Sequence, residues 1–271
     1  MPELPEVETT RRGIAPHLLG QRVRAVVVRN PRLRWKVPVA LVTELPGQTV
    51  RAVERRAKYL LLRADNGTVI VHLGMSGSLR IADRSDPAGR FDHLDLVLED
   101  GTCLRLRDPR RFGSVLWTRG PPADHVLLRN IGPEPLTAGF DGMYLYTRTR
   151  RRTAAIRDLL LNARIVAGIG NIYANEALFQ ARIRPSRRAG RLSRPECGRL
   201  VAAIRGTLTR AIKAGGTTLR DFRKADGAPG HFQHTLYVYG RAGKRCRRCA
   251  AQIRALHIGQ RRAFYCPHCQ H

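Results

Sequence analysis

The chain has 271 residues, a length that suggests two domains at about 100 to 200 residues per domain. Hydrophobic residues make up 43% of it and charged residues 26%, which provides enough apolar material for real cores and excludes a wholly disordered chain. Lys and Arg number 49 against 21 Asp and Glu, and the resulting charge of +28 indicates a polyanionic partner, with nucleic acid favoured over an anionic membrane surface.

The sequence carries no sign of membrane insertion or export. No segment approaches the roughly 18 uncharged apolar residues of a membrane span. The acidic start MPELPEVE also lacks the basic and apolar parts of a signal peptide. We therefore expect a soluble cytoplasmic protein that does not engage membranes.

The N-terminal half shows one helix followed by many short strands. Pro5 suits a first helical position and Glu6 favours the positive end of the helix dipole, so a helix is predicted over residues 5–19. Between residues 22 and 117, short apolar runs alternate with Asp-Asn-Gly and Glu-Asp-Gly turns, which is typical of antiparallel strands. The pattern predicts a first domain, residues 1–131, built as a β-sandwich with a leading helix.

The C-terminal half is predicted to be helical, which makes the whole chain a two-domain α+β protein. Residues 132–140 are rich in Pro and Gly and are interpreted as a linker. Apolar residues then recur at helical spacing in a domain assigned to residues 141–225. Residues 141–271 carry 27 basic and 6 acidic residues, so this half is expected to be the stronger polyanion binder. The helices are predicted near residues 150–162, 172–180 and 197–214.

Two close cysteine pairs end the sequence, with sixteen residues between them. Paired thiolates at this spacing provide the tetrahedral sulfur set of a structural zinc site, whereas two unrelated or redox-active CxxC motifs are the less favoured interpretation. Residues 241–271 are therefore predicted to form a zinc hairpin that binds one structural Zn²⁺ through Cys246, Cys249, Cys266 and Cys269.

Pro2 becomes chemically interesting if the methionine before it is removed, because it then carries a secondary amine. An α-amino group has a pKa of about 8, so part of it is neutral near neutral pH and can attack a sugar aldehyde carbon to form an iminium. Glu3 and Glu6 lie close enough in sequence to move protons. Taken alone, these residues are explained better by an ordinary helix start.

Six motifs in order change that interpretation. Together they strongly resemble the bacterial formamidopyrimidine-DNA glycosylases, bifunctional repair enzymes for oxidised purines, over essentially the whole chain. The motifs are Pro2-Glu3-Leu4-Pro5-Glu6-Val7-Glu8, Ala57-Lys58-Tyr59-Leu60, His72-Leu73-Gly74-Met75-Ser76-Gly77, Asp108-Pro109-Arg110-Arg111-Phe112-Gly113, Gly168-Ile169-Gly170-Asn171-Ile172-Tyr173-Ala174 and Phe264-Tyr265-Cys266-Pro267-His268-Cys269-Gln270.

The resemblance implies a reaction and assigns residues to it. Pro2 matches the nucleophile that attacks C1′ of a flipped-out nucleotide, and Glu3 matches the acid that assists opening of the sugar ring. Glu6 matches an acidic residue that supports the site, and Lys58 matches a lysine that holds phosphate near the lesion. Excision of 8-oxoguanine or formamidopyrimidines would be followed by β,δ-elimination at the abasic site, without a catalytic metal.

The resemblance also implies how duplex DNA is held. Three residues match those that fill the void left by the flipped base: Met75, Phe112 and Arg110. The apolar Met75 and the wedged Phe112 can occupy the void, and Arg110 can hydrogen-bond the unpaired cytosine. Asn171, in a helix-two-turn-helix, and Arg261, on the zinc hairpin, match phosphate contacts. His93 is expected to be a further DNA contact, residues 226–240 to contain a lesion-capping loop, and the enzyme to act as a monomer.

Some positions depart from the family pattern. Arg157 replaces a common lysine and Phe91 a frequent histidine, while Asn162-Ala163 and Arg262-Ala263 replace other usual pairs. None is the expected nucleophile, acid or zinc ligand, so these departures bear on phosphate contacts and helix packing.

Two alternatives remain at this point. An endonuclease VIII-like glycosylase for oxidised pyrimidines would share Pro2, Glu3 and the zinc hairpin, although Leu4 and Val7 favour the purine enzyme. A non-enzymatic zinc-containing DNA-binding protein would explain the charge and the cysteines, but it does not explain the acidic N-terminal segment.

Overall fold

The structure is a computed structural model that describes residues 2–217 and 235–271. The chain divides into two compact units. Unit 1 comprises Met1–Asn130 and Ala214–Gln233, and unit 2 comprises Ile131–Lys213 and His234–His271. Most of the expected lesion-capping loop, residues 226–234, lies outside the described residues.

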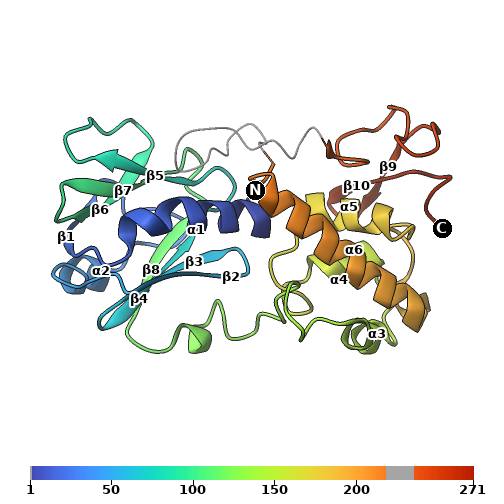
Figure 1. The fold of residues 1–271 in the computed structure, drawn as a ribbon, viewed down its shortest axis with the longest axis horizontal. Coiled ribbons are helices and arrows are strands. Elements are labelled where there is room, and N and C mark those ends of the chain that lie inside the picture. The colour runs from blue at the N-terminus through green and yellow to red at the C-terminus, as the bar shows by residue number, and fades with distance from the viewer. Residues whose placement is uncertain (1, 218–234) are drawn as a thin grey trace. The chain divides into compact units, whose positions relative to one another are not determined.

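Unit 1 contains two four-stranded antiparallel sheets, as the alternating sequence pattern predicts (Figure 1). The sheets and the leading helix confirm the predicted fold class of this domain. The first sheet has the order β1-β6-β7-β5, formed by β1 (Val23–Val28), β6 (Asp92–Leu98), β7 (Thr102–Arg107) and β5 (Ser78–Asp83). The second has the order β2-β3-β4-β8, formed by β2 (Ala52–Arg56), β3 (Tyr59–Ala64), β4 (Gly67–His72) and β8 (Ser114–Thr118).

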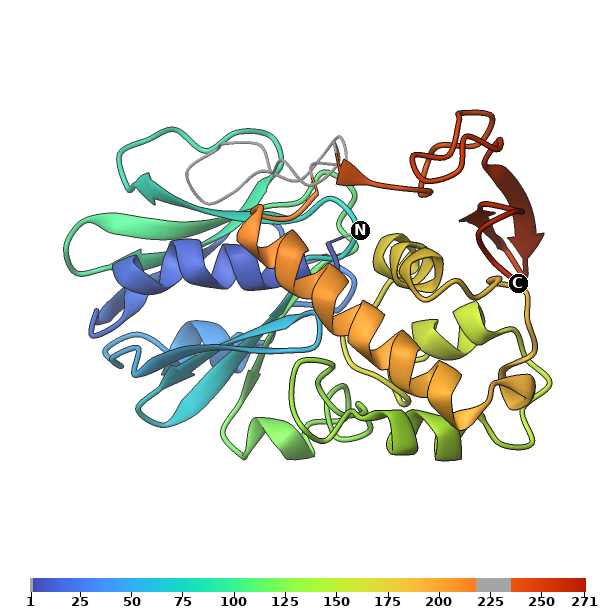
Figure 2. The same cartoon turned by 45° about the vertical axis from the view of Figure 1, so that its right-hand side comes forward.

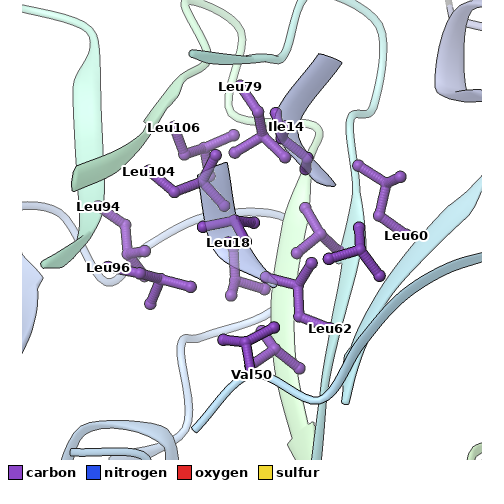
Figure 3. Close-up of a cluster of buried hydrophobic side chains, with 14 of the residues drawn as sticks. Ile14, Leu18, Val50, Leu60, Leu62, Leu79, Leu94, Leu96, Leu104 and Leu106 are labelled. Carbon is purple, nitrogen blue, oxygen red and sulfur yellow. The ribbon is translucent and has the colours of Figure 1, made fainter. Parts of the chain in front are cut away.

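Two helices cover the open sides between these sheets. Helix α1 (Leu4–Leu18) contacts the edge strands β5 and β2, and α2 (Val39–Glu44) contacts the opposite edge strands β1 and β8. Figure 3 shows Ile14 and Leu18 of α1 pointing into a cluster of leucines from both sheets. Burying these apolar side chains fixes α1, and with it the N-terminal residues, against the sandwich.

Unit 2 is built around helix α5 (Asn171–Gln180), of which residues 172–179 are all buried. Figure 2 shows α5, in yellow, beside the long orange helix α6. Helices α4 (Ile156–Leu161) and α6 (Arg194–Lys213) pack against α5, and α3 (Gly142–Thr149) packs against α6. A hairpin of β9 (Arg254–Ile258) and β10 (Arg261–Tyr265) contacts α5 through β10. Single 3₁₀ turns occur at Pro122–Asp124 in unit 1 and Ala189–Arg191 in unit 2.

The helix predicted near residues 150–162 is shorter than expected. Helix α3 ends before Arg150, Arg151 has a left-handed φ of 58°, and α4 begins only at Ile156. The run of arginines at 150–152 provides no apolar face, whereas Ile156, Leu159 and Leu160 do. The apolar pattern therefore predicted the second half of this segment correctly and extended it too far towards the N-terminus.

Within residues 2–217 and 235–271, no helix combines the length and the apolar character needed to cross a bilayer.

Candidate functional site

The start of α1 brings three predicted site residues together. Glu3 is the N-cap of the helix, and Pro2, which is buried, directly precedes it. Glu6 lies one turn further on, and its Oε2 accepts a hydrogen bond of 2.9 Å from the Glu3 backbone N–H. Both carboxyl groups are almost inaccessible, with 3% of Glu3 and 2% of Glu6 exposed. Two buried acids therefore lie at the start of the helix beside Pro2, at the positive end of the helix dipole.

A tight hairpin loop positions Lys58. Arg56 pairs with Tyr59 across the β2–β3 hairpin, so that only Ala57 and Lys58 form the loop. Ala57 has φ 53°, in the left-handed region that residues with a Cβ rarely adopt. Such strain is retained where the surrounding structure requires one particular loop conformation. Lys58 therefore lies in a two-residue loop with a defined backbone conformation.

His72, the last residue of β4, is a candidate that the sequence interpretation did not single out. Burial, followed by the positive charges of Lys58 and Arg34, lowers the pKa of its imidazole to about 4. The Gly74 N–H donates to its Nδ1 at 3.0 Å, so the neutral ring carries its proton on Nε2. His72 is therefore an uncharged hydrogen-bond donor beside Lys58. The histidine is visible in the sequence, but its tautomer and its charged neighbours are visible only in the fold.

A shared network joins the loop after β4 to the loop before β8. Buried Asp108 accepts hydrogen bonds from Ser76 Oγ at 2.8 Å and from the Gly113 N–H at 2.7 Å. The Arg110 N–H donates to the same Ser76 oxygen at 3.2 Å. Gly74, with φ 62°, lies so close to the Phe112 backbone that a Cβ would overlap it. The two loops are therefore held as one rigid element.

This element presents an unusual surface, because its large apolar side chains are exposed. Met75 is 39% exposed and Phe112 is 45% exposed. The Arg110 guanidinium lies 4.9 Å from the centre of the Phe112 ring. Exposed apolar side chains on a rigid support, next to a cation, can enter a cavity in an anionic partner.

His93 lies behind this surface. It is only 5% exposed, and its Nε2 makes a hydrogen bond of 2.8 Å with the Asp108 carbonyl oxygen. These contacts support the loop from the interior. Direct contact of His93 with DNA stays a prediction.

In unit 2, Asn171 at the start of α5 contacts the hairpin. Its Nδ2 donates to the Arg262 carbonyl oxygen at 3.0 Å. Buried Arg157 contacts the Asn171 Oδ1 at 3.4 Å and donates to the carbonyl oxygens of Ile258 and Arg261 at 2.7 and 3.2 Å. Arg157 thus connects α4, α5 and both ends of the β9–β10 turn. Arg261 itself is exposed.

Three further departures from the family pattern, at Phe91, Arg262 and Ala263, are accommodated by their surroundings. Ala263 is completely buried, so a small residue suits that position. The Arg262 guanidinium lies 5.6 Å from the Phe264 ring centre. The guanidinium groups of Arg90 and Arg107 lie 5.4 and 5.0 Å from the centre of the Phe91 ring.

The four C-terminal cysteines converge on one point beside the hairpin. Their sulfur atoms all lie within 4.8 Å of one another, and none forms a disulfide. Cys246 and Cys269 are 4.0 Å apart and Cys249 and Cys266 are 3.4 Å apart. A tetrahedral ion with metal–sulfur bonds of about 2.3 Å requires sulfur atoms about 3.8 Å apart, so this cluster could bind one metal ion.

A buried carboxylate fixes the chain that leads into this hairpin. Glu176 of α5 accepts backbone hydrogen bonds of 2.9 Å each from Tyr237, Val238 and Tyr239. Burial raises the pKa of Glu176, and the three N–H donors act in the opposite direction. Sequence periodicity alone places Glu176 on a helix without indicating that it faces inward.

Comparisons with known proteins agree with the motifs and the geometry. Residues 1–115 match the Formamidopyrimidine-DNA glycosylase N-terminal domain, and residues 131–223 match the Formamidopyrimidine-DNA glycosylase H2TH domain. The chain is 56% identical to the formamidopyrimidine-DNA glycosylases of Thioalkalivibrio sulfidiphilus and Stutzerimonas stutzeri, with 100% of each chain covered.

Solved structures show the same similarity. The MutM (Fpg) protein of Thermus thermophilus is 39% identical, with 99% of this chain and 98% of that chain covered and a TM-score of 0.89. The Lactococcus lactis Fpg in a complex with DNA containing an abasic site is 34% identical, with 99% of both chains covered and a TM-score of 0.91. The chain belongs to the formamidopyrimidine-DNA glycosylase family.

Proposed function

We propose that the chain is a bifunctional DNA glycosylase and abasic-site lyase that excises oxidised purines from duplex DNA in the cytoplasm. The observation that carries this proposal is the buried Pro2-Glu3 start, with Glu6 bonded to the Glu3 N–H. A DNA-binding protein without catalytic activity would use these two acids only to cap the helix, whereas the resemblance of the N-terminal motif assigns them to a reaction at Pro2. The family and the Lactococcus lactis Fpg complexes with DNA support the same substrate class.

Removal of Met1 would make the Pro2 nitrogen a secondary amine. Its lone pair attacks C1′ of the damaged nucleotide and the bond to the oxidised base breaks. The base leaves with the bonding electrons and takes up a proton, while the Pro2 nitrogen gives one up. Glu3 donates a proton to the sugar ring oxygen as the ring opens, which yields an iminium between Pro2 and C1′. The iminium acidifies the C2′ proton, and loss of that proton expels the 3′ phosphate and then, by a second elimination, the 5′ phosphate.

The surface groups divide into two tasks. Met75, Phe112 and Arg110 fill the space left by the flipped base, with the Arg110 guanidinium hydrogen-bonded to the orphaned cytosine. Lys58, Asn171 and Arg261 hold phosphates. The neutral His72 adds a hydrogen-bond donor near Lys58 without adding charge. Arg157 keeps the Asn171 and Arg261 region in one arrangement.

The metal is one structural Zn²⁺ bound by the four cysteines. The sulfur distances and the all-thiolate donor set fit a closed tetrahedral site, which leaves no position for a reacting water. When bound, the ion supplies structural order to the hairpin that carries Arg261.

The test is covalent trapping with borohydride. The purified chain is mixed with duplex DNA containing 8-oxoguanine opposite cytosine and is then reduced, and peptide mapping locates the cross-link. We expect one cross-link per chain, at Pro2, in a protein that has lost Met1. Binding without a cross-link would favour a non-enzymatic DNA-binding protein, and preferential trapping on oxidised pyrimidines would favour the endonuclease VIII-like alternative.

Two arginine variants separate phosphate contact from readout of the opposite base. Arg261→Ala should weaken binding to every duplex and lower the log–log salt slope by about 1, because one phosphate contact is lost. Arg110→Ala should leave the slope nearly unchanged and reduce discrimination for cytosine by roughly 1 to 3 kcal/mol. Salt titrations of both variants against duplexes that differ only in the opposite base make the comparison. If Arg110→Ala changes the salt slope but leaves the discrimination for cytosine unchanged, Arg110 is a phosphate contact.

A further inference from the structure

Both oxygens of the Glu6 carboxylate accept hydrogen bonds, and the described donors come from two distant parts of the sequence. Its Oε2 accepts from the Glu3 N–H at 2.9 Å. Its Oε1 accepts from both the backbone N–H and the side-chain Oγ of Thr217, at 2.8 Å each. Thr217 lies 211 residues away in sequence, and it is only 2% exposed. Both residues belong to unit 1.

The backbone before Thr217 is shaped to make this contact. Gly215 and Gly216 have φ values of 75° and 78°, which only glycine adopts readily. A Cβ at Gly216 would lie 3.0 Å from the Glu6 Oε1 and 3.2 Å from its Cγ. The chain therefore packs its backbone directly against the Glu6 side chain, which brings the Thr217 N–H and hydroxyl onto the same oxygen.

We propose that Thr217 is a positioning residue for the N-terminal nucleophile, acting through Glu6. Two donors on Oε1 fix the rotation of the carboxyl group, and this rotation keeps Oε2 on the Glu3 N–H. That N–H belongs to the peptide bond between Pro2 and Glu3, so its direction sets where the Pro2 nitrogen and the Glu3 carboxyl point. The inference rests on the proposed function, because it assigns Thr217 to the reaction assigned to Pro2 and Glu3.

Thr217→Val is the direct test, since it removes the hydroxyl donor and nearly keeps the side-chain shape. We expect the single-turnover rate of 8-oxoguanine excision to fall by about 10-fold or more, because small misplacements of a nucleophile are costly. The affinity for undamaged duplex should stay within about 2-fold of the parent, since Thr217 contributes no charge to phosphate binding. Thr217→Ser restores a hydroxyl and should recover most of the rate. The rate of borohydride trapping on a preformed abasic site should fall in parallel, because that step also needs Pro2.

Thr10→Val is the matched control. Thr10 is 1% exposed on α1, and its Oγ donates to Glu6 as well, but to the backbone carbonyl oxygen at 3.0 Å instead of the carboxylate. The Thr10→Val variant should lose about as much thermal stability as Thr217→Val, but it should keep the excision rate of the parent. Gly216→Ala is a second test variant. The added Cβ would push against the Glu6 Oε1, so the excision rate should fall although Thr217 itself is unchanged.

The outcomes are distinguishable. If the parent neither excises nor becomes trapped, the proposed function fails. If the parent is active and Thr217→Val matches it, the positioning role alone is wrong. The positioning role is equally wrong if Thr217→Val and Thr10→Val lose the same activity in proportion to their melting temperatures, or if Thr217→Ser fails to recover.

Discussion

Replacing Glu3 with Gln should nearly abolish removal of the damaged base while leaving DNA binding in place. The amide has the shape of the carboxyl group but cannot deliver a proton to the sugar ring oxygen. General acid catalysis contributes typically 100- to 10,000-fold, so we expect a loss of excision rate in that range. Single-turnover excision of 8-oxoguanine, with duplex affinity measured in parallel, makes the test.

Glu8→Gln is the appropriate control for this experiment. Glu8 lies on the same helix but forms ion pairs with Arg11, Arg12 and Arg55 on the side of the sandwich, where hydrogen bonds and charge from these arginines lower its pKa despite burial. Its loss should reduce stability without a comparable loss of excision. Unchanged turnover in Glu3→Gln would remove Glu3 from the mechanism, and equal losses in both variants would point to damage of the helix instead of chemistry.

Removing zinc should disorder the C-terminal hairpin and lower DNA affinity at the same time. The hairpin is small, and its apolar cluster includes the cysteines themselves, together with Val238, Ile253 and Phe264. Zinc binding to short four-ligand segments releases about 10–16 kcal/mol at pH 7, so most of the order of this segment should come from the ion. Because β10 carries Arg261, the loss of order should weaken binding to undamaged and damaged duplex alike.

Chelation of the purified chain and the variant Cys266→Ser should give the same result. Zinc content, hydrogen exchange of the hairpin amides and duplex affinity are the three measurements. Cys103→Ala controls for the loss of a thiol, since Cys103 is buried in β7 far along the chain from the cluster. Full DNA affinity in a sample proven free of metal would refute the structural role of zinc.

Local patterns in the sequence were sufficient for much of the fold. The helix over residues 5–19 is observed as α1, one residue earlier at each end, because its start is specified by neighbouring residues: Glu3 as N-cap and Pro5 in the first turn. The strands between residues 22 and 117 follow from apolar runs and turn residues. The cysteine spacing alone indicated a four-thiolate cluster, and the structure brings the four sulfur atoms together.

Tertiary structure alone decided the contacts that join distant segments. The lowered pKa of His72 depends on its burial in the folded sheet and on the charges of Lys58 and Arg34, which come from other parts of the chain. In the sequence Arg157 is only an arginine in place of a common lysine, yet in the fold it is 1% exposed and one of its terminal nitrogens donates to two carbonyl oxygens of the β9–β10 turn. Thr217 meets Glu6 across 211 residues, a separation that no local pattern can encode. Periodicity and spacing predict contacts between residues that are close in sequence. Long-range hydrogen bonds depend instead on how whole helices and strands pack against one another.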